Sequence, residues 1–249
     1  MSFCKNCGEK VVGNYCSHCG QKTAEVRISF HYIWHETLHF FTHFEKGFLF
    51  TSWSMLAKPG KVVTDFVKGK RKIYQQPVSF FLIWITMYLL LLYIVEKIFG
   101  ENVVIDYKEY FGPRSTTKFA VSHLSIVLLV VIPFQALYFY WLVAWKKYNY
   151  FECFVVAMYY LGTVILLQCV FVILVIIIHP LIGTSVALIY SDPLKIIYLA
   201  WAVTNTIKLF RIKNKSIRIV LFAILAFGTF TVWRLYGVPA IIEWIMGES

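Results

Sequence analysis

The chain has 249 residues, of which 59% are hydrophobic, 18% aromatic and only 15% charged. A soluble domain usually carries about 25% charged residues, so this composition excludes an ordinary soluble protein and predicts an all-α integral membrane protein. The formal net charge of +11 is also typical of nucleic-acid-binding proteins. Here, however, the basic residues gather beside the apolar runs, and membrane topology explains them better than a nucleic-acid partner.

Residues 1–24 contain the most specific motif. Cys4-x2-Cys7 and Cys16-x2-Cys19 are each followed by glycine, and two such turns can present four thiolates to one structural zinc ion. Four cysteines complete the tetrahedral shell, so the zinc would have no catalytic role, and His18 is expected to be exposed. The spacing predicts a small zinc ribbon.

The ribbon is expected in the cytoplasm. The first thirty residues contain no apolar run of the length a signal peptide needs, and a reducing compartment favours metal binding over disulfides. A ribbon there would offer a docking surface to an unidentified cytoplasmic protein. The alternative is a stabilised terminus without a partner.

Residues 35–39, HETLH, match the HExxH pattern of zinc metalloproteases, in which two histidines bind zinc and the glutamate acts as general base. The glycine of one extended form of that motif is absent, because Thr42 stands in its place. Histidines recur here at intervals of four, which makes a chance match easy. Catalysis is therefore the weaker interpretation, and an interfacial or packing face is preferred. The catalytic candidates are His35, Glu36 and His39, and a second metal site would use His31, His35, His39 and His43.

Residues 29–76 are expected to form amphipathic helices in the membrane interface. Pro59 and Gly60 end one helix, and the next has a short apolar face. A polybasic segment follows immediately before the first apolar run, where anionic lipid headgroups would bind it. An apolar stripe is expected at Phe30, Ile33, Trp34, Leu38, Phe41 and Phe48. The lipid-contact residues are Lys68, Lys70, Arg71 and Lys72.

Residues 77–249 are expected to form a transmembrane helical bundle. A membrane-spanning helix needs about 20 predominantly apolar residues. Five runs approach this length, although the fourth is weakened by Lys195 and Asn205. The predicted spans are 77–99, 119–145, 152–178, 193–210 and 217–236.

Orientation follows from the positive charge that cytoplasmic loops retain. Eighteen of the 24 lysines and arginines fall in residues 1–76, 146–147 and 208–218, whereas the loop at 179–192 has none. This pattern predicts a multi-pass protein of a bacterial inner membrane, with its N-terminus in the cytoplasm and its C-terminus outside.

The first 92 residues resemble a bacterial family of multi-span membrane proteins that is known only as a domain of unknown function. The shared features are the knuckle ending CSHCGQK, an aromatic-rich helix, Thr51, the step Lys58-Pro59-Gly60, the element Gly69-Lys70-Arg71, and Tyr74 and Pro77 at the membrane entry. Glu45 departs from the aspartate expected before the glycine. The resemblance implies a zinc ribbon, an interfacial region and a helical bundle, and it implies no reaction.

The predicted function is that of a non-enzymatic scaffold, regulator or accessory that binds lipids and a cytoplasmic protein. Two alternatives stay open. One is a pore or channel that serves as an accessory, for example in a bacterial defence system, and the other is a membrane-surface zinc metalloprotease. The sequence also leaves open whether the chain forms a homo-oligomer.

Overall fold

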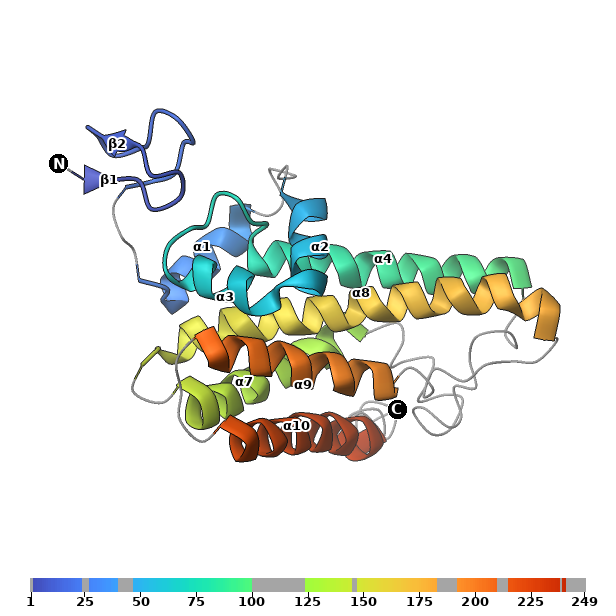
Figure 1. Ribbon diagram of the computed structural model, residues 1–249. Coiled ribbons are helices and arrows are strands. Elements are labelled where there is room, and N and C mark those ends of the chain that lie inside the picture. The colour runs from blue at the N-terminus through green and yellow to red at the C-terminus, as the bar shows by residue number, and fades with distance from the viewer. Residues whose placement is uncertain are drawn as a thin grey trace, which may run out of the picture.

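The computed structural model describes residues 2–23, 27–39, 47–99, 124–144, 147–182, 192–209, 215–237 and 239–240. The chain begins with a small two-stranded unit, and the other regular elements in these ranges are helical (Figure 1). The strands are β1 (Ser2–Phe3) and β2 (Lys10–Val11). The helices are α1 (Phe30–His39), α2 (Phe48–Ala57), α3 (Pro59–Val67), α4 (Pro77–Phe99), α7 (Leu124–Phe139), α8 (Tyr150–Ile182), α9 (Asp192–Leu209) and α10 (Lys215–Val232), and two π-helical segments are η1 (Tyr140–Ala144) and η3 (Trp233–Gly237).

Each predicted span corresponds to a helix at nearly the same residues. The first span, 77–99, coincides with α4. The other four correspond to α7 with η1, α8, α9, and α10 with η3. Within the described residues, two helices are long and apolar enough to cross a membrane, α4 over Pro77–Val95 and α8 over Tyr150–Ile178. Shorter apolar helices cover Leu128–Ala144 and Ile217–Thr229.

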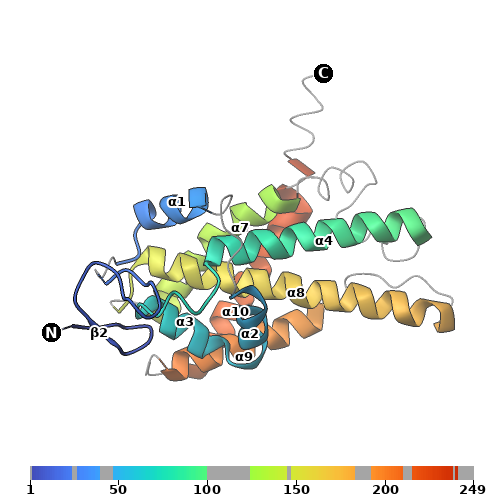
Figure 2. The ribbon, with the colours of Figure 1, turned by 90° about the horizontal axis from the view of Figure 1, so that it is seen from above.

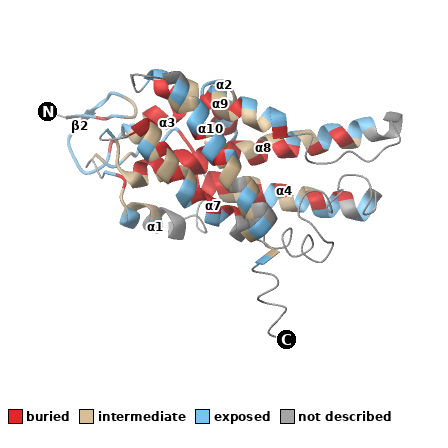
Figure 3. Cartoon of the chain, turned by 90° about the horizontal axis from the view of Figure 1, so that it is seen from below, coloured by how far each residue is buried: buried red, intermediate tan, exposed pale blue. Residues whose placement is uncertain are grey.

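The long helices pack side by side, and the two-stranded N-terminal unit, residues 2–23 and called the ribbon below, lies at one end of the bundle (Figures 1 and 2). One apolar core joins α4, α7 and α8, and a second joins α2, α3 and the neighbouring parts of α4, α8, α9 and α10. Buried residues lie where these helices meet, whereas exposed residues lie on their outer sides (Figure 3). The ring of Tyr159 illustrates the second core, because it packs edge-on against Phe66 of α3 and also contacts Phe80 of α4.

Helix α3 is part of this core. Its residues Val62, Val63 and Phe66 are buried, and Gly60 lies directly against the backbone of α9. A Cβ atom at Gly60 would be 2.7 Å from the carbonyl carbon of Asn205 and 2.8 Å from the nitrogen of Thr206. The predicted break at Pro59 is confirmed, since α2 ends at Ala57 and α3 begins at Pro59.

The predicted apolar stripe of residues 29–48 is divided between two helices. Phe30 and Trp34 of α1 are exposed and Ile33 is half-buried, whereas Phe48 belongs to α2 and is buried. The side chain of Leu38 and all of Phe41 lie outside the described residues.

Helix α8 begins with a capping box, which satisfies backbone groups that a helix start leaves unpaired. The N–H of Glu152 donates to the side chain of Asn149, and the N–H of Asn149 donates to the carboxylate of Glu152, both at 2.7 Å. The same two side chains hold the segment that follows the ribbon. Arg27 pairs with Glu152 at 3.3 Å, and Asn149 donates to the carbonyl of Ile28 at 2.9 Å.

Candidate metal centre

The first CxxCG turn folds as a compact knuckle. The N–H of Cys4 donates to the carbonyl of Glu9, and the N–H of Gly8 donates to the carbonyl of Cys4, both at 2.8 Å. Gly8 has a φ of +82°, a conformation that glycine adopts without a steric penalty. The strands β1 and β2 close the turn by pairing Phe3 with Lys10.

The second turn repeats this geometry twelve residues later in the chain. The N–H of Cys16 donates to the carbonyl of Gln21, and that of Gly20 donates to the carbonyl of Cys16, again at 2.8 Å. Gly20 has a φ of +71°, and a bridge between Tyr15 and Lys22 occupies the place of the β1–β2 pair. The two knuckles are therefore structural repeats, each of which presents two thiols.

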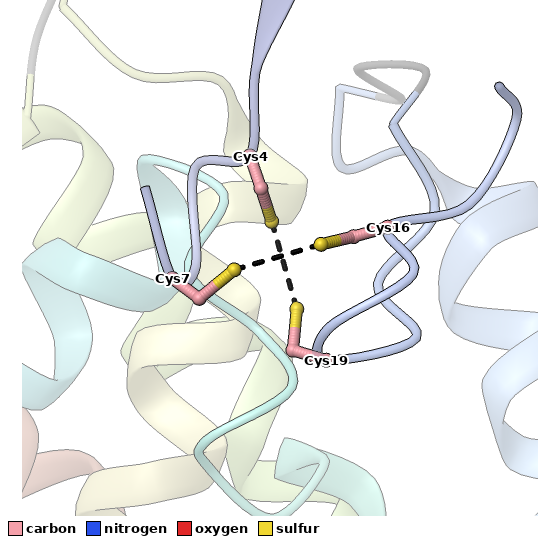
Figure 4. A group of neighbouring side chains, drawn as sticks. All are labelled: Cys4, Cys7, Cys16 and Cys19. Atoms are coloured by element: carbon pink, nitrogen blue, oxygen red, sulfur yellow. Dashed lines mark hydrogen bonds between the residues drawn. The ribbon is translucent and has the colours of Figure 1, made fainter. Parts of the chain in front are cut away.

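The four thiols converge on one point (Figure 4). The Sγ atoms of Cys4 and Cys19 lie 3.6 Å apart, those of Cys7 and Cys16 lie 3.5 Å apart, and all four lie within 4.8 Å of one another. These distances are much longer than the roughly 2.05 Å of a disulfide bond, so the cysteines are free thiols. One ion can contact all four of them.

The backbone and the neighbouring thiols change the pKa values of these cysteines. The backbone N–H of Cys7, with help from that of Asn6, lowers the pKa of the Cys4 thiol to about 7, and the N–H of Cys19 lowers the pKa of Cys16 in the same way. The N–H of Glu9 favours the Cys7 thiolate, but burial and the neighbouring thiols of Cys16 and Cys4 outweigh it and raise the pKa of Cys7 to about 12. Thiolates this close repel one another, and a bound cation would remove that repulsion.

A glutamine fixes the ribbon to the polybasic loop, residues 68–72. The side-chain amide of Gln21 donates to the carbonyl of Gly69 at 2.7 Å, and its oxygen accepts the N–H groups of Arg71 at 3.2 Å and Lys72 at 3.3 Å. Lys5 of the first knuckle also approaches this loop, 3.1 Å from where a Cβ atom of Gly69 would be. Because Gln21 closes the second knuckle through its carbonyl, one residue contacts both the four-cysteine cluster and the loop.

The four predicted lipid-contact residues differ in their surroundings. Lys68, Lys70 and Lys72 are exposed, and Lys70 lies 3.7 Å from Asp65. Arg71 is half-buried, with its guanidinium over the rings of Tyr32 at 4.6 Å and Phe66 at 5.7 Å. Arg71 therefore joins the loop to α1 and α3, and the three lysines present charge to the outside.

The other predicted ligands are placed only in part. Residues 35–39 end helix α1, so His35 and His39 are one turn apart, but their side chains and that of Glu36 lie outside the described residues. His43 also lies outside them, whereas His31 is exposed. His18 is exposed between the second pair of cysteines and is not one of the four clustered ligands.

Sequence patterns identified the cysteines but missed the residues that support them. Gln21, Asn149 and Glu152 have no spacing that indicates their partners, which are 48 to 125 residues away in the chain. The only available signal was the capping pattern of Asn149 with Glu152 three residues later.

Comparison with protein families confirms the resemblance to a family of unknown function. The family model described as Protein of unknown function (DUF3667) matches residues 45–89. This segment contains α2, α3, the polybasic loop and the first half of α4. The four-cysteine cluster lies outside the match. No match was found among curated proteins or among solved structures.

Proposed function

We propose that this chain is a non-enzymatic, multi-pass membrane protein that acts as a scaffold, regulator or accessory through a cytoplasmic zinc ribbon. The main observation behind this proposal is that four thiols from two repeated knuckles converge on one point. Zinc–sulfur bonds of about 2.3 Å in a tetrahedron correspond to sulfur–sulfur separations of roughly 3.8 Å. The closest pairs, at 3.6 and 3.5 Å, are close to that geometry.

The ligand set supports a structural role for this zinc. Four protein thiolates leave no coordination position for a water molecule or substrate. The apolar cluster of the ribbon consists of Val11 and the cysteines themselves, so burial contributes little to its folding. Zinc binding would supply most of the folding free energy, as in other small metal-binding domains.

The bundle supports a five-span topology with the ribbon at the cytoplasmic face. Positive charge gathers at the end of the bundle where the ribbon lies. The polybasic loop is hydrogen-bonded to Gln21 of the ribbon, and Arg27 pairs with Glu152 at the start of α8. Lys147 lies between η1 and α8, and Arg218 lies in the first turn of α10. Arg218 donates to the carbonyl of Leu142 in η1 at 2.9 Å. Gathering of positive charge at one end is the expected signature of the cytoplasmic side.

The free surface of the ribbon supports a docking role. Three of its apolar side chains are exposed, namely Phe3, Val12 and Tyr15. Burying apolar side chains is favourable, so a partner that covers them would gain free energy. The residues that hold the ribbon on the bundle are different ones, namely Gln21 and Lys5. A cytoplasmic protein can therefore contact the apolar side chains while the ribbon remains attached.

Affinity purification from native membranes tests this proposal. We expect a specific partner to be recovered with the wild-type chain and lost with Cys4→Ser/Cys7→Ser and with Val12→Asp/Tyr15→Ser. His18→Ala, which changes an exposed residue of the same ribbon, is the matched control and should keep the partner. Recovery of the same proteins with all variants would contradict a docking role for the ribbon.

A further inference from the structure

We propose that helix α2 inserts its exposed face, formed by Leu49, Phe50 and Trp53, among the acyl chains of the lipid layer at the ribbon side of the membrane. This inference rests on the proposed membrane bundle and identifies a lipid-binding surface outside its spans. The occupant is an anionic phospholipid.

The outer face of α2 is apolar, which is unlike the outer face of a helix in water. The inner face holds Thr51 and Ser52, 0% and 6% exposed, together with Phe48 and Met55, whereas Leu49, Phe50 and Trp53 on the outer face are 77%, 48% and 72% exposed. A helix on a water-soluble protein places its apolar residues inward and its hydroxyl groups outward. Large apolar side chains toward the surroundings, with hydroxyl groups kept on the inner face, are the arrangement expected in lipid.

The buried hydroxyl groups fix the rotation of α2. The Thr51 hydroxyl accepts the N–H of Gln75 at 2.8 Å, and the Ser52 hydroxyl accepts the indole N–H of Trp84 at 3.2 Å. Turning the apolar face inward would break both hydrogen bonds and leave polar groups buried without partners. The orientation is therefore specified by the protein and not by chance exposure of a mobile helix.

The position of α2 agrees with the depth of an interfacial helix. Its first residues pack on α4, where the ring of Phe48 lies 5.3 Å from that of Trp84. Trp84 follows Pro77, the first residue of α4, by seven residues, which corresponds to about 10 Å along a helix. Interfacial helices bury their apolar face by about 5–10 Å. Met87, one turn beyond Trp84, is also exposed, so the apolar surface continues along α4.

The border of this surface is cationic. Phe50 stacks on Tyr74 with ring centroids 5.9 Å apart, and Ile73 beside it is exposed. The polybasic loop ends at Lys72, the residue before Ile73. Aromatic side chains next to lysines are typical of a membrane interface, where the rings contact acyl chains and the ammonium groups contact anionic headgroups. This continuity from an apolar face to a basic edge selects phospholipid over a soluble protein.

Site-specific photocrosslinking tests the inference with the full-length chain in vesicles of phosphatidylcholine and phosphatidylglycerol. Benzoylphenylalanine replaces Phe50 or Trp53, and mass spectrometry identifies the adduct. Two control sites have similar exposure, Leu90 on α4 at 56% and Tyr15 in the ribbon at 63%. We expect phospholipid adducts at residues 50, 53 and 90, at comparable yields, and none at residue 15.

Each other outcome overturns a defined part of the account. Two outcomes would overturn the inference alone, both with lipid adducts at residue 90. In the first, residues 50 and 53 give no lipid adducts. In the second, they crosslink to a second copy of the chain or to another protein. Absence of lipid adducts at residue 90 would overturn the membrane bundle and the inference with it.

Discussion

The absence of a Cβ atom at Gly60 sets the distance between helices α3 and α9. The missing Cβ lets α3 contact the backbone of α9 (Asn205 and Thr206), and a backbone cannot move aside as a flexible side chain can. The Lys58-Pro59-Gly60 step of the matched family segment thus has a packing explanation. The sequence predicted that this step ends a helix, but it gave no sign that the glycine contacts a helix about 145 residues later, because that contact exists only in the tertiary structure.

Gly60→Ala should therefore destabilise the bundle. Overpacking a tight contact costs about 1–3 kcal/mol, and we expect a lower unfolding midpoint of the purified protein in detergent. Gly228→Ala in α10 is the matched control, because a Cβ there meets nothing within 4 Å and alanine favours a helix. Equal unfolding midpoints for Gly60→Ala and the wild type would show that α3 does not pack on α9 in this way.

The lowered pKa of the Cys4 thiol leads to a prediction of how metal binding depends on pH. Its pKa is lowered from 9.0 to about 7, so the thiolate stabilises the metal-free folded ribbon fully above pH 9.0, and this contribution is lost as the pH falls through about 7. Thiols must also lose their protons to bind metal. Dialysis at about pH 5 should remove metal that dialysis at neutral pH leaves bound, as measured by elemental analysis. Unchanged metal content at the lower pH would contradict this prediction.

At the scale of elements, local patterns were sufficient for the helices but not for their environment. Hydropathy is a property of contiguous residues, so the run at 77–99 predicted α4 at its exact residues, and the two CxxCG turns predicted the clustered thiols. Residues 29–76 were expected to form amphipathic helices in the interface, but no local pattern showed that α3 packs against α9 or that α2 turns its hydroxyl groups inward. Those arrangements depend on partners such as Gln75, Trp84 and Asn205, which no local pattern identifies.

The contact between the ribbon and the polybasic loop leads to a prediction for Gln21. Its carbonyl accepts the N–H of Cys16, and its side chain accepts those of Arg71 and Lys72. Gln21→Ala should retain the metal but increase hydrogen–deuterium exchange of these two loop amides. Removing the metal from the wild-type chain with a chelator should have the same effect, because the knuckle that positions Gln21 depends on Cys16.

The control for this experiment is His18→Ala, which should leave both metal content and loop exchange unchanged. The contradicting result is equal hydrogen–deuterium exchange of residues 69–72 in the Gln21→Ala variant, the chelated protein and the wild type. It would show that the ribbon does not hold the loop. Loss of metal from His18→Ala would instead assign that histidine to the metal shell.

For the whole molecule, the five-span topology predicts that the two ends of each spanning helix lie on opposite sides of the membrane. Lys70→Cys and Lys208→Cys should react with a membrane-impermeant maleimide only from the cytoplasmic side, and Lys97→Cys and Ala240→Cys only from outside. All four positions are exposed. Cys153 and Cys169 are buried, but Cys7 and Cys19 are only half-buried, so the wild-type chain is labelled in parallel to give the background. Reaction of Lys208→Cys and Ala240→Cys from the same side would show that α10 does not cross the membrane.

Metal analysis of the purified full-length chain tests the central claim most directly. The account predicts one zinc ion per wild-type chain, held by the four thiols of Cys4, Cys7, Cys16 and Cys19, and none in Cys4→Ser/Cys7→Ser. Wild-type protein that binds no metal, or a double variant that keeps its full metal content, would contradict it.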